Sequence, residues 1–91
     1  MKIVKLSAMP FAQASVRIYD DGSIELKSYD TIVAFITNAG WLYIRGLYSM
    51  TTRKHIGAFV KEYANIDFAT AKQLYNDVLC YNIKTGEVMS Y

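Results

Sequence analysis

Apolar and polar residues alternate along two stretches of the chain, and a short polar segment ending in glycine interrupts each stretch. Residues 15–29 contain the segment Asp20–Gly22, and residues 31–49 contain the segment Asn38–Gly40. Alternation of this kind is typical of β-strands that bury one face, and glycine is frequent in the loops that join such strands. Each stretch therefore predicts a β-hairpin.

The register of the first hairpin follows from the rule that residues paired across two strands share one face of the sheet. A two-residue turn would set Ile18 against Glu25 and would mix apolar with charged side chains. A three-residue loop sets Ile18 against Ile24 instead. We therefore predict the three-residue loop, closed by Gly22 in the left-handed conformation.

The second hairpin follows the same rule, with Gly40 closing its loop and Ile36 opposite Leu42. One face of this hairpin then carries aliphatic and small residues, namely Ile32, Ala34, Ile36, Leu42, Ile44 and Gly46. The other face carries Val33, Phe35, Trp41, Tyr43, Arg45 and Leu47. Strands that are apolar on both faces are usually buried on both, so a terminal segment or a partner is expected to cover the second face.

The link between the two hairpins decides which faces join. A two-residue turn at Tyr29 and Asp30 would put Leu26 on the face of Phe35, whereas a three-residue turn from Ser28 would put it on the face of Ala34. We favour the three-residue turn, because it collects the aliphatic residues of both hairpins beneath the helices.

Residues 46–63 change to the helical period, with an apolar stripe at Ile56, Phe59, Val60 and Tyr63. Ser49, Thr51 or Thr52 supplies the N-cap. The cations Arg53, Lys54 and Lys61 lie off the stripe, towards water.

A second helical pattern follows in residues 65–79, capped by Asp67 or Asn65. Its apolar residues in phase are Phe68, Ala71, Leu74, Tyr75 and Val78. Residues 2–8 predict a short strand, and residues 80–91 predict a strand or hairpin around Gly86. The sequence thus predicts a single α+β domain, residues 1–91, in which an antiparallel sheet packs against two helices.

The composition agrees with a folded globule, since 53% of the 91 residues are hydrophobic and 20% are charged. The formal net charge of +2 is too small to indicate nucleic-acid binding by itself. No apolar run approaches the ~20 residues of a membrane span, and the N-terminus lacks the pattern of a signal peptide. A single cysteine, Cys80, excludes an internal disulfide, and we expect a cytoplasmic protein.

No catalytic or metal site is predicted. His55, Ser49 and Asp67 supply the residue types of a triad, but the sequence around them has no nucleophile elbow. One histidine and one cysteine are too few for a zinc site, and Asp20–Gly22 lacks the rest of a calcium loop. We expect a protein that is not an enzyme and has no cofactor.

Two binding surfaces are candidates. The helix start contains Thr51, Thr52, Arg53, Lys54 and His55. It is interpreted either as a capped turn with solvated cations, which we favour, or as an anion or nucleic-acid contact. The aromatic face of the second hairpin carries Phe35, Trp41, Tyr43 and Arg45. This face is interpreted either as core or as a partner-binding surface, because these residue types dominate binding hot spots.

The stretch 28–63 resembles a family of small uncharacterised proteins carried by phages and mobile elements of Gram-positive gut bacteria. The resemblance is carried by a motif of Tyr48, Ser49, Thr51, Thr52, Arg53, His55 and Ile56. It implies a phage-type accessory protein in a bacterial host and brings no known activity. We therefore expect a protein-binding module directed at a host factor such as a defence nuclease. The alternatives are a nucleic-acid-binding module that uses the basic helix start, and a structural homo-oligomer.

Overall fold

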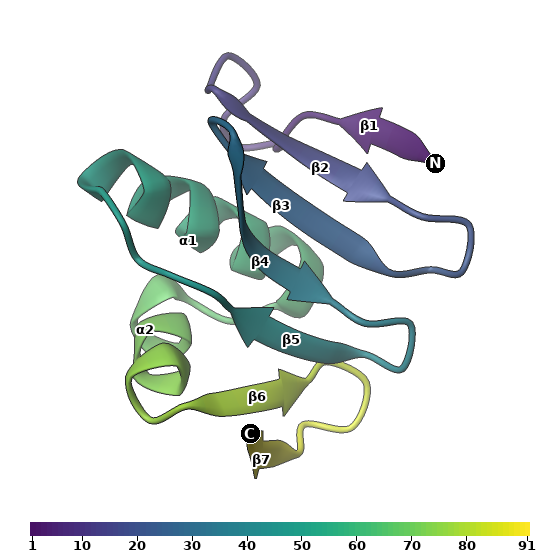
Figure 1. Ribbon diagram of the computed structural model, residues 1–91, viewed down its shortest axis with the longest axis vertical. Coiled ribbons are helices and arrows are strands. Elements are labelled where there is room, and N and C mark those ends of the chain that lie inside the picture. The colour runs from purple at the N-terminus through teal and green to yellow at the C-terminus, as the bar shows by residue number, and fades with distance from the viewer.

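The computed structural model describes residues 1–91 and shows seven antiparallel strands that follow one another across one sheet in chain order (Figure 1). The strands are β1 (Lys2–Val4), β2 (Ala14–Ile18), β3 (Ile24–Ser28), β4 (Thr31–Ile36), β5 (Trp41–Ile44), β6 (Leu79–Asn82) and β7 (Val88–Ser90). Two helices, α1 (Met50–Ala64) and α2 (Phe68–Asn76), connect β5 to β6. The predicted α+β fold with a C-terminal hairpin is confirmed.

Both predicted loop registers are also confirmed. Ile18 lies opposite Ile24 in the first hairpin, and Ile36 lies opposite Leu42 in the second. Gly22 has φ 91° and Gly40 has φ 98°, so each glycine closes its loop in the left-handed region, as predicted.

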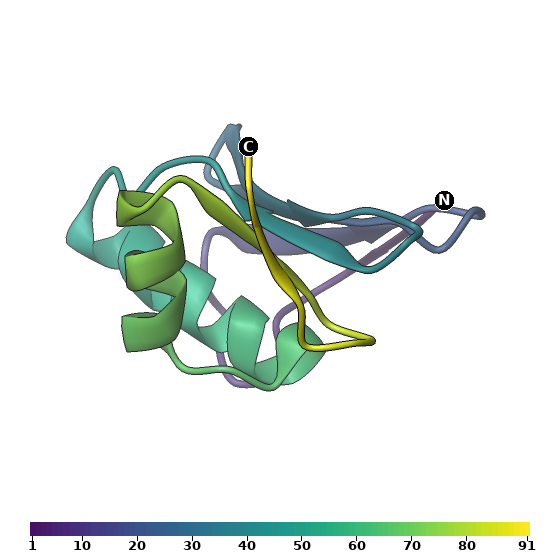
Figure 2. The same ribbon diagram turned by 90° about the horizontal axis from the view of Figure 1, so that it is seen from below.

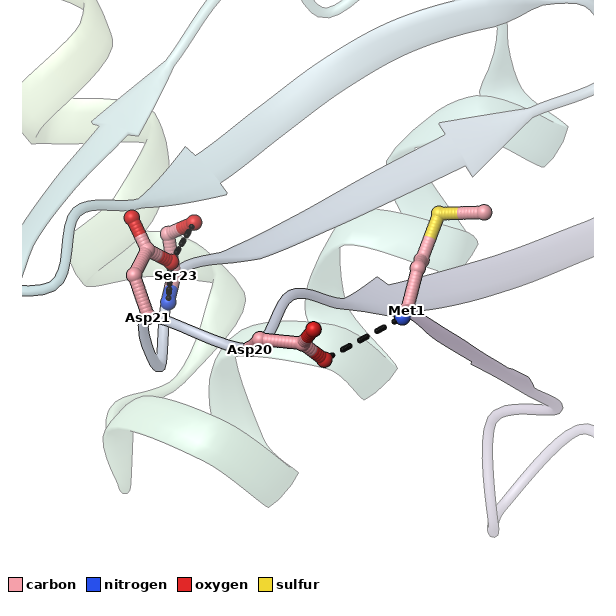
Figure 3. Close-up of polar contacts among 4 residues, drawn as sticks. All are labelled: Met1, Asp20, Asp21 and Ser23. Carbon is pink, nitrogen blue, oxygen red and sulfur yellow. Dashed lines mark hydrogen bonds and ion pairs between the residues drawn. The ribbon is translucent and has the colours of Figure 1, made fainter.

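The two aspartates of the first loop accept hydrogen bonds from nearby groups of the same chain (Figure 3). Asp21 Oδ1 accepts hydrogen bonds from the Ser23 N–H at 2.8 Å and from its hydroxyl at 2.7 Å, and these bonds lower the pKa of the Asp21 carboxyl. Asp20 Oδ1 accepts one from the amino group of Met1 at 3.2 Å. No group of three His, Cys, Asp or Glu residues lies close enough together to hold a metal ion.

The link between the hairpins differs from the predicted three-residue turn. Ser28 pairs with Thr31, so the turn consists of two residues, Tyr29 and Asp30. Tyr29 has a positive φ of 51°, and its N–H donates to the carbonyl of Gln13 at 2.8 Å. A contact outside the hairpin, which the local sequence does not reveal, thus helps to hold the shorter turn.

A β-bulge corrects the register that this shorter turn would otherwise impose. Lys27 pairs with Ile32 but Leu26 pairs with Ala34, which leaves Val33 as the extra residue of β4. Leu26 therefore reaches the predicted face. The predicted places of Ile32 and Val33 are wrong, because Val33 is fully buried in the core and Ile32 is only half-buried.

The helices cover one face of the sheet, as the edge-on view shows (Figure 2). Ile56, Phe59 and Val60 of the predicted stripe are fully buried against it. Leu47, which alternation assigned to the opposite face, is also part of this core, because β5 ends at Ile44 and the alternation stops there.

The helix caps fall within the predicted sets. Ser49 caps α1 by accepting from the Thr52 N–H at 3.1 Å, and Asp67 caps α2 by accepting from the Thr70 N–H at 2.8 Å. The predicted apolar phase of the second helix runs too far, because α2 ends at Asn76 and Val78 has φ 55° outside it.

The first strand is shorter than predicted. It ends at Val4, after which the chain leaves the sheet and buries Leu6 completely in the core. Ser7 fixes this departure, since its N–H and hydroxyl each donate to the Glu62 carboxylate of α1 at 2.9 Å.

Candidate protein-binding surface

The helices leave one face of the sheet uncovered (Figure 2), and the strand registers place one continuous row of residues on it. Pairing along consecutive strands β1 to β5 sets these residues opposite one another, in the order Ile3, Arg17, Glu25, Phe35 and Tyr43. We call the face with this row the open face. Its charged part lies on β2 and β3, and its aromatic part lies on β4 and β5.

The aromatic part is a cluster of three rings. Phe35 and Tyr43 stack with centroids 4.9 Å apart and an angle of 17° between the rings. Tyr91 meets Tyr43 edge-on, also at 4.9 Å, with an angle of 76°. Both geometries are favourable for aromatic pairs. Tyr91 nevertheless stays 56% exposed, so the cluster is accessible from solvent.

A groove of about 700 Å³ opens beside this cluster. Its walls come from β4, from β5 and the residue after it, from the end of α2 and the turn that follows it, and from the residue after β7. The lining residues are Phe35, Tyr43, Ile44, Arg45, Tyr75, Asn76, Val78 and Tyr91. Most of them are apolar or aromatic, which is typical of ligand-binding grooves.

The structure brings together three of the four residues predicted for partner binding. Phe35, Tyr43 and Arg45 line the groove, whereas Trp41 does not. Trp41 is half-buried on β5 near the second loop, where its backbone N–H donates to Thr37 Oγ1 at 3.0 Å. It therefore belongs to the neighbourhood of the groove rather than to its lining.

Three lining residues, Tyr75, Val78 and Tyr91, do not follow from the sequence pattern. Tyr75 and Val78 were assigned to the buried phase of a helix, yet they are 37% and 50% exposed. No local pattern identifies them, because three segments that are distant in the chain meet here.

Two tyrosines, one beside the charged part and one in the aromatic part, have raised pKa values. The Tyr19 hydroxyl donates to the Glu25 carboxylate, and this bond raises the pKa of Tyr19. In the aromatic part, the neighbouring Cys80 thiol, followed by burial, raises the pKa of Tyr43. Cys80 itself is buried, as predicted for a small apolar side chain.

The residues of the basic helix start are not brought together on one surface. Thr52 and His55 are buried, at 4% and 1% exposure. Arg53 Nε donates to the Leu47 carbonyl at 3.0 Å, and only Thr51 and Lys54 point freely into solvent.

The three residues that carry the residue types of a triad, Ser49, His55 and Asp67, are likewise separated in their contacts. The hydroxyl beside His55 Nδ1 belongs to Ser28, at 2.8 Å, rather than to Ser49. Asp67 serves as the cap of α2. Burial lowers the pKa of His55 and so favours the neutral imidazole inside the core.

Comparison with protein families now places the chain. A model for a family of unknown function, DUF8033, matches residues 2–77, which include strands β1 to β5 and both helices. The chain belongs to this family. Neither curated proteins nor solved structures give a match. In this DUF8033 member, neither helix combines the length and the apolar character that crossing a bilayer requires.

Proposed function

We propose that this DUF8033 member is a non-enzymatic protein-binding module that engages another polypeptide through its open face. The observation that carries the proposal is the aromatic cluster of Phe35, Tyr43 and Tyr91 on the open face, beside the groove. Tyrosine, phenylalanine and arginine are enriched in the centres of protein interfaces. An apolar patch with a charged rim is also typical of protein interfaces, and here the rim is formed by Arg17, Glu25 and Arg45.

The biological setting of the proposal is a phage or mobile-element accessory protein in the cytoplasm of a bacterial host. The motif that runs from Tyr48 to Ile56 supports this setting through its resemblance to such proteins. A small binding module suits the inhibition of a host factor, such as a defence nuclease, because occlusion of a surface needs no catalysis.

The test compares two exposed tyrosines. Tyr91 is 56% exposed beside the groove, and Tyr48 is 67% exposed just before α1. Wild type, Tyr91→Ala, Trp41→Ala and the matched control Tyr48→Ala are immobilised and exposed to lysate of the bacterial host. Bound proteins are quantified by mass spectrometry, and circular dichroism confirms that each variant is folded.

We expect at least one host protein to be retained by wild type and Tyr48→Ala and to be lost from Tyr91→Ala. Light scattering on purified wild type and Tyr91→Ala identifies the case in which the partner is a second copy. In that case wild type has the mass of an oligomer and Tyr91→Ala has a lower mass. A monomeric wild type whose captured proteins are all retained by Tyr91→Ala and Trp41→Ala would refute the proposal.

A further inference from the structure

The chemistry of the groove narrows the kind of partner. Its aromatic walls, Phe35, Tyr43, Tyr75 and Tyr91, offer ring faces and edges that desolvate an apolar side chain. The volume of about 700 Å³ is sufficient for a short peptide segment. The walls alone therefore select an aromatic or aliphatic anchor.

Arg45 adds a charge preference to this apolar site. It is exposed, and it forms no ion pair, because the only ion pair in the structure joins the Met1 amino group to Asp20. A guanidinium is well suited to a carboxylate, to which it donates two parallel hydrogen bonds. A cationic ligand would instead be repelled, although aromatic walls by themselves would attract it.

Val78 forms part of the groove wall in an unusual backbone conformation. It is β-branched and adopts φ 55°, a region that such residues rarely occupy. Its side chain is half exposed and lines the groove, while its N–H donates to the Tyr75 carbonyl and its carbonyl accepts from the Tyr91 N–H, both at 3.2 Å. Backbone strain of this kind is concentrated at functional sites.

We propose that the groove binds an acidic segment of the partner protein, in which a large apolar side chain stands next to a carboxylate. The apolar side chain packs among the tyrosines, and the carboxylate pairs with Arg45. This assignment rests on the proposed function of the open face, and it adds the chemical class of the segment that is bound.

A displayed library of random peptides tests the assignment. The library is selected in parallel on wild type, on Arg45→Glu and on Lys61→Glu, a matched charge reversal at an exposed position of α1. We expect wild type and Lys61→Glu to enrich peptides with an acidic residue beside an aromatic or aliphatic one. Arg45→Glu should enrich a basic residue at the same place.

Synthesised peptides from the wild-type selection then give the quantitative result by fluorescence anisotropy. Arg45→Glu should weaken the binding of the acidic peptide by about tenfold or more, because a hydrogen-bonded charge pair contributes that much. The glutamine version of the peptide should bind wild type more weakly than the acidic peptide does, and it should bind Arg45→Glu more tightly, because it removes the repulsion between two carboxylates.

The two proposals fail in different ways. Selected peptides that bind wild type and Arg45→Glu equally but lose affinity in Tyr91→Ala would overturn the acidic class and leave the open face as a binding surface. Peptides that are insensitive to Arg45→Glu, Tyr75→Ala and Tyr91→Ala alike would overturn the groove as their site and, with it, the acidic class. The lysate test with Trp41→Ala still decides the open face as a whole.

Discussion

Ser28 and His55 are joined inside the core, where Ser28 Oγ lies 2.8 Å from His55 Nδ1 and the two residues are 2% and 1% exposed. Thr52 Oγ1 lies 3.0 Å from the same serine oxygen, and the Ser49 hydroxyl donates to Thr52 at 3.2 Å. This hydrogen-bond network ties the end of β3 to the start of α1, and it contains the only histidine of the chain.

The buried histidine predicts that stability falls on mild acidification. Burial lowers the pKa of His55 below its ordinary value of 6.5. The unfolded chain therefore takes up a proton near pH 6.5, whereas the folded chain takes it up only at lower pH. The contribution of neutral His55 to the free energy of unfolding is fully present above pH 6.5, and it is lost as the pH falls through the pKa of the folded state. Urea unfolding at about pH 7.5 and about pH 5 should show the decrease.

His55→Gln is the control for this pH dependence, because it removes the titrating group. The variant should be less stable at neutral pH, yet its urea midpoint should stay nearly constant over the same interval. The lowered pKa values of Asp21 and Asp67 affect stability only near and below their ordinary value of 3.8, outside this window. A wild-type slope that persists in His55→Gln would contradict the assignment.

Loss of the serine hydroxyl tests the network itself. Ser28→Ala should lower the free energy of unfolding by about 1–3 kcal/mol, because it leaves buried polar atoms of His55 and Thr52 without this partner. Ser15→Ala, a matched change at a half-buried position of β2, should have a much smaller effect. Equal destabilisation by both variants in urea titrations would show that the network contributes little.

Alanine substitutions at the two loop glycines, Gly22 and Gly40, should destabilise the fold by different amounts. Both have positive φ, so alanine is strained at either position by roughly 1 kcal/mol or more. A methyl group at Gly22 meets nothing within 4 Å, whereas one at Gly40 lies 3.0 Å from Lys84 Cγ and 3.1 Å from Asn82 Oδ1. Gly40→Ala should therefore lower the thermal midpoint more than Gly22→Ala. The reverse order would contradict the packing around the second loop.

Much of the sheet could be predicted because its registers are fixed by neighbouring residues. The three-residue loops follow from pairing like side chains and from the position of one glycine in each loop. The link at Tyr29 and Asp30 could not be predicted in this way, because contacts outside the hairpin help to fix it. The Tyr29 N–H bonds to Gln13, and the carbonyl of the bulged Val33 accepts from the Arg45 N–H at 2.8 Å.

Because of the bulge, the burial of two neighbouring residues of β4 is the opposite of what alternation predicts. Val33 is fully buried and Ile32 is half-buried, although alternation assigns Ile32 to the core. Val33→Thr places a hydroxyl in the core and should cost about 1–3 kcal/mol. Ile32→Thr should cost clearly less, as measured by chemical denaturation. A larger loss at Ile32 than at Val33 would mean that the strand has no bulge.

The groove illustrates what sequence periodicity does not capture. Phe35, Tyr43 and Arg45 could be predicted to share a face because they lie on one hairpin. Val78 fits a helical period, but the helix ends at Asn76 and Val78 lies exposed beyond it, whereas Tyr75 is exposed within the last turn of α2. Surface sites built from several segments depend on where elements end, and periodicity defines those ends poorly.

The basic helix start predicts a negative result for nucleic acids. Thr52 and His55 are buried and Arg53 is engaged with Leu47, so few groups remain there for phosphate. Wild type and the double variant Arg53→Ala, Lys54→Ala should show the same, negligible affinity for DNA and RNA oligonucleotides at low salt. Strong wild-type binding that the double variant loses, with a reduced salt dependence, would establish the nucleic-acid alternative.

A substitution at Val78 should change stability and peptide binding in opposite directions. Asparagine tolerates the left-handed region better than a β-branched residue does, so Val78→Asn should raise the free energy of unfolding by about 1 kcal/mol. The same change removes an apolar side chain from the groove wall and should weaken the binding of a selected peptide. Val88→Asn is the matched control, because Val88 is also 50% exposed but lies in β7. That variant should lose stability and keep the peptide affinity. Thermal unfolding and fluorescence anisotropy on the same samples separate the two effects, and a Val78→Asn variant that is less stable than wild type would show that this backbone is not strained.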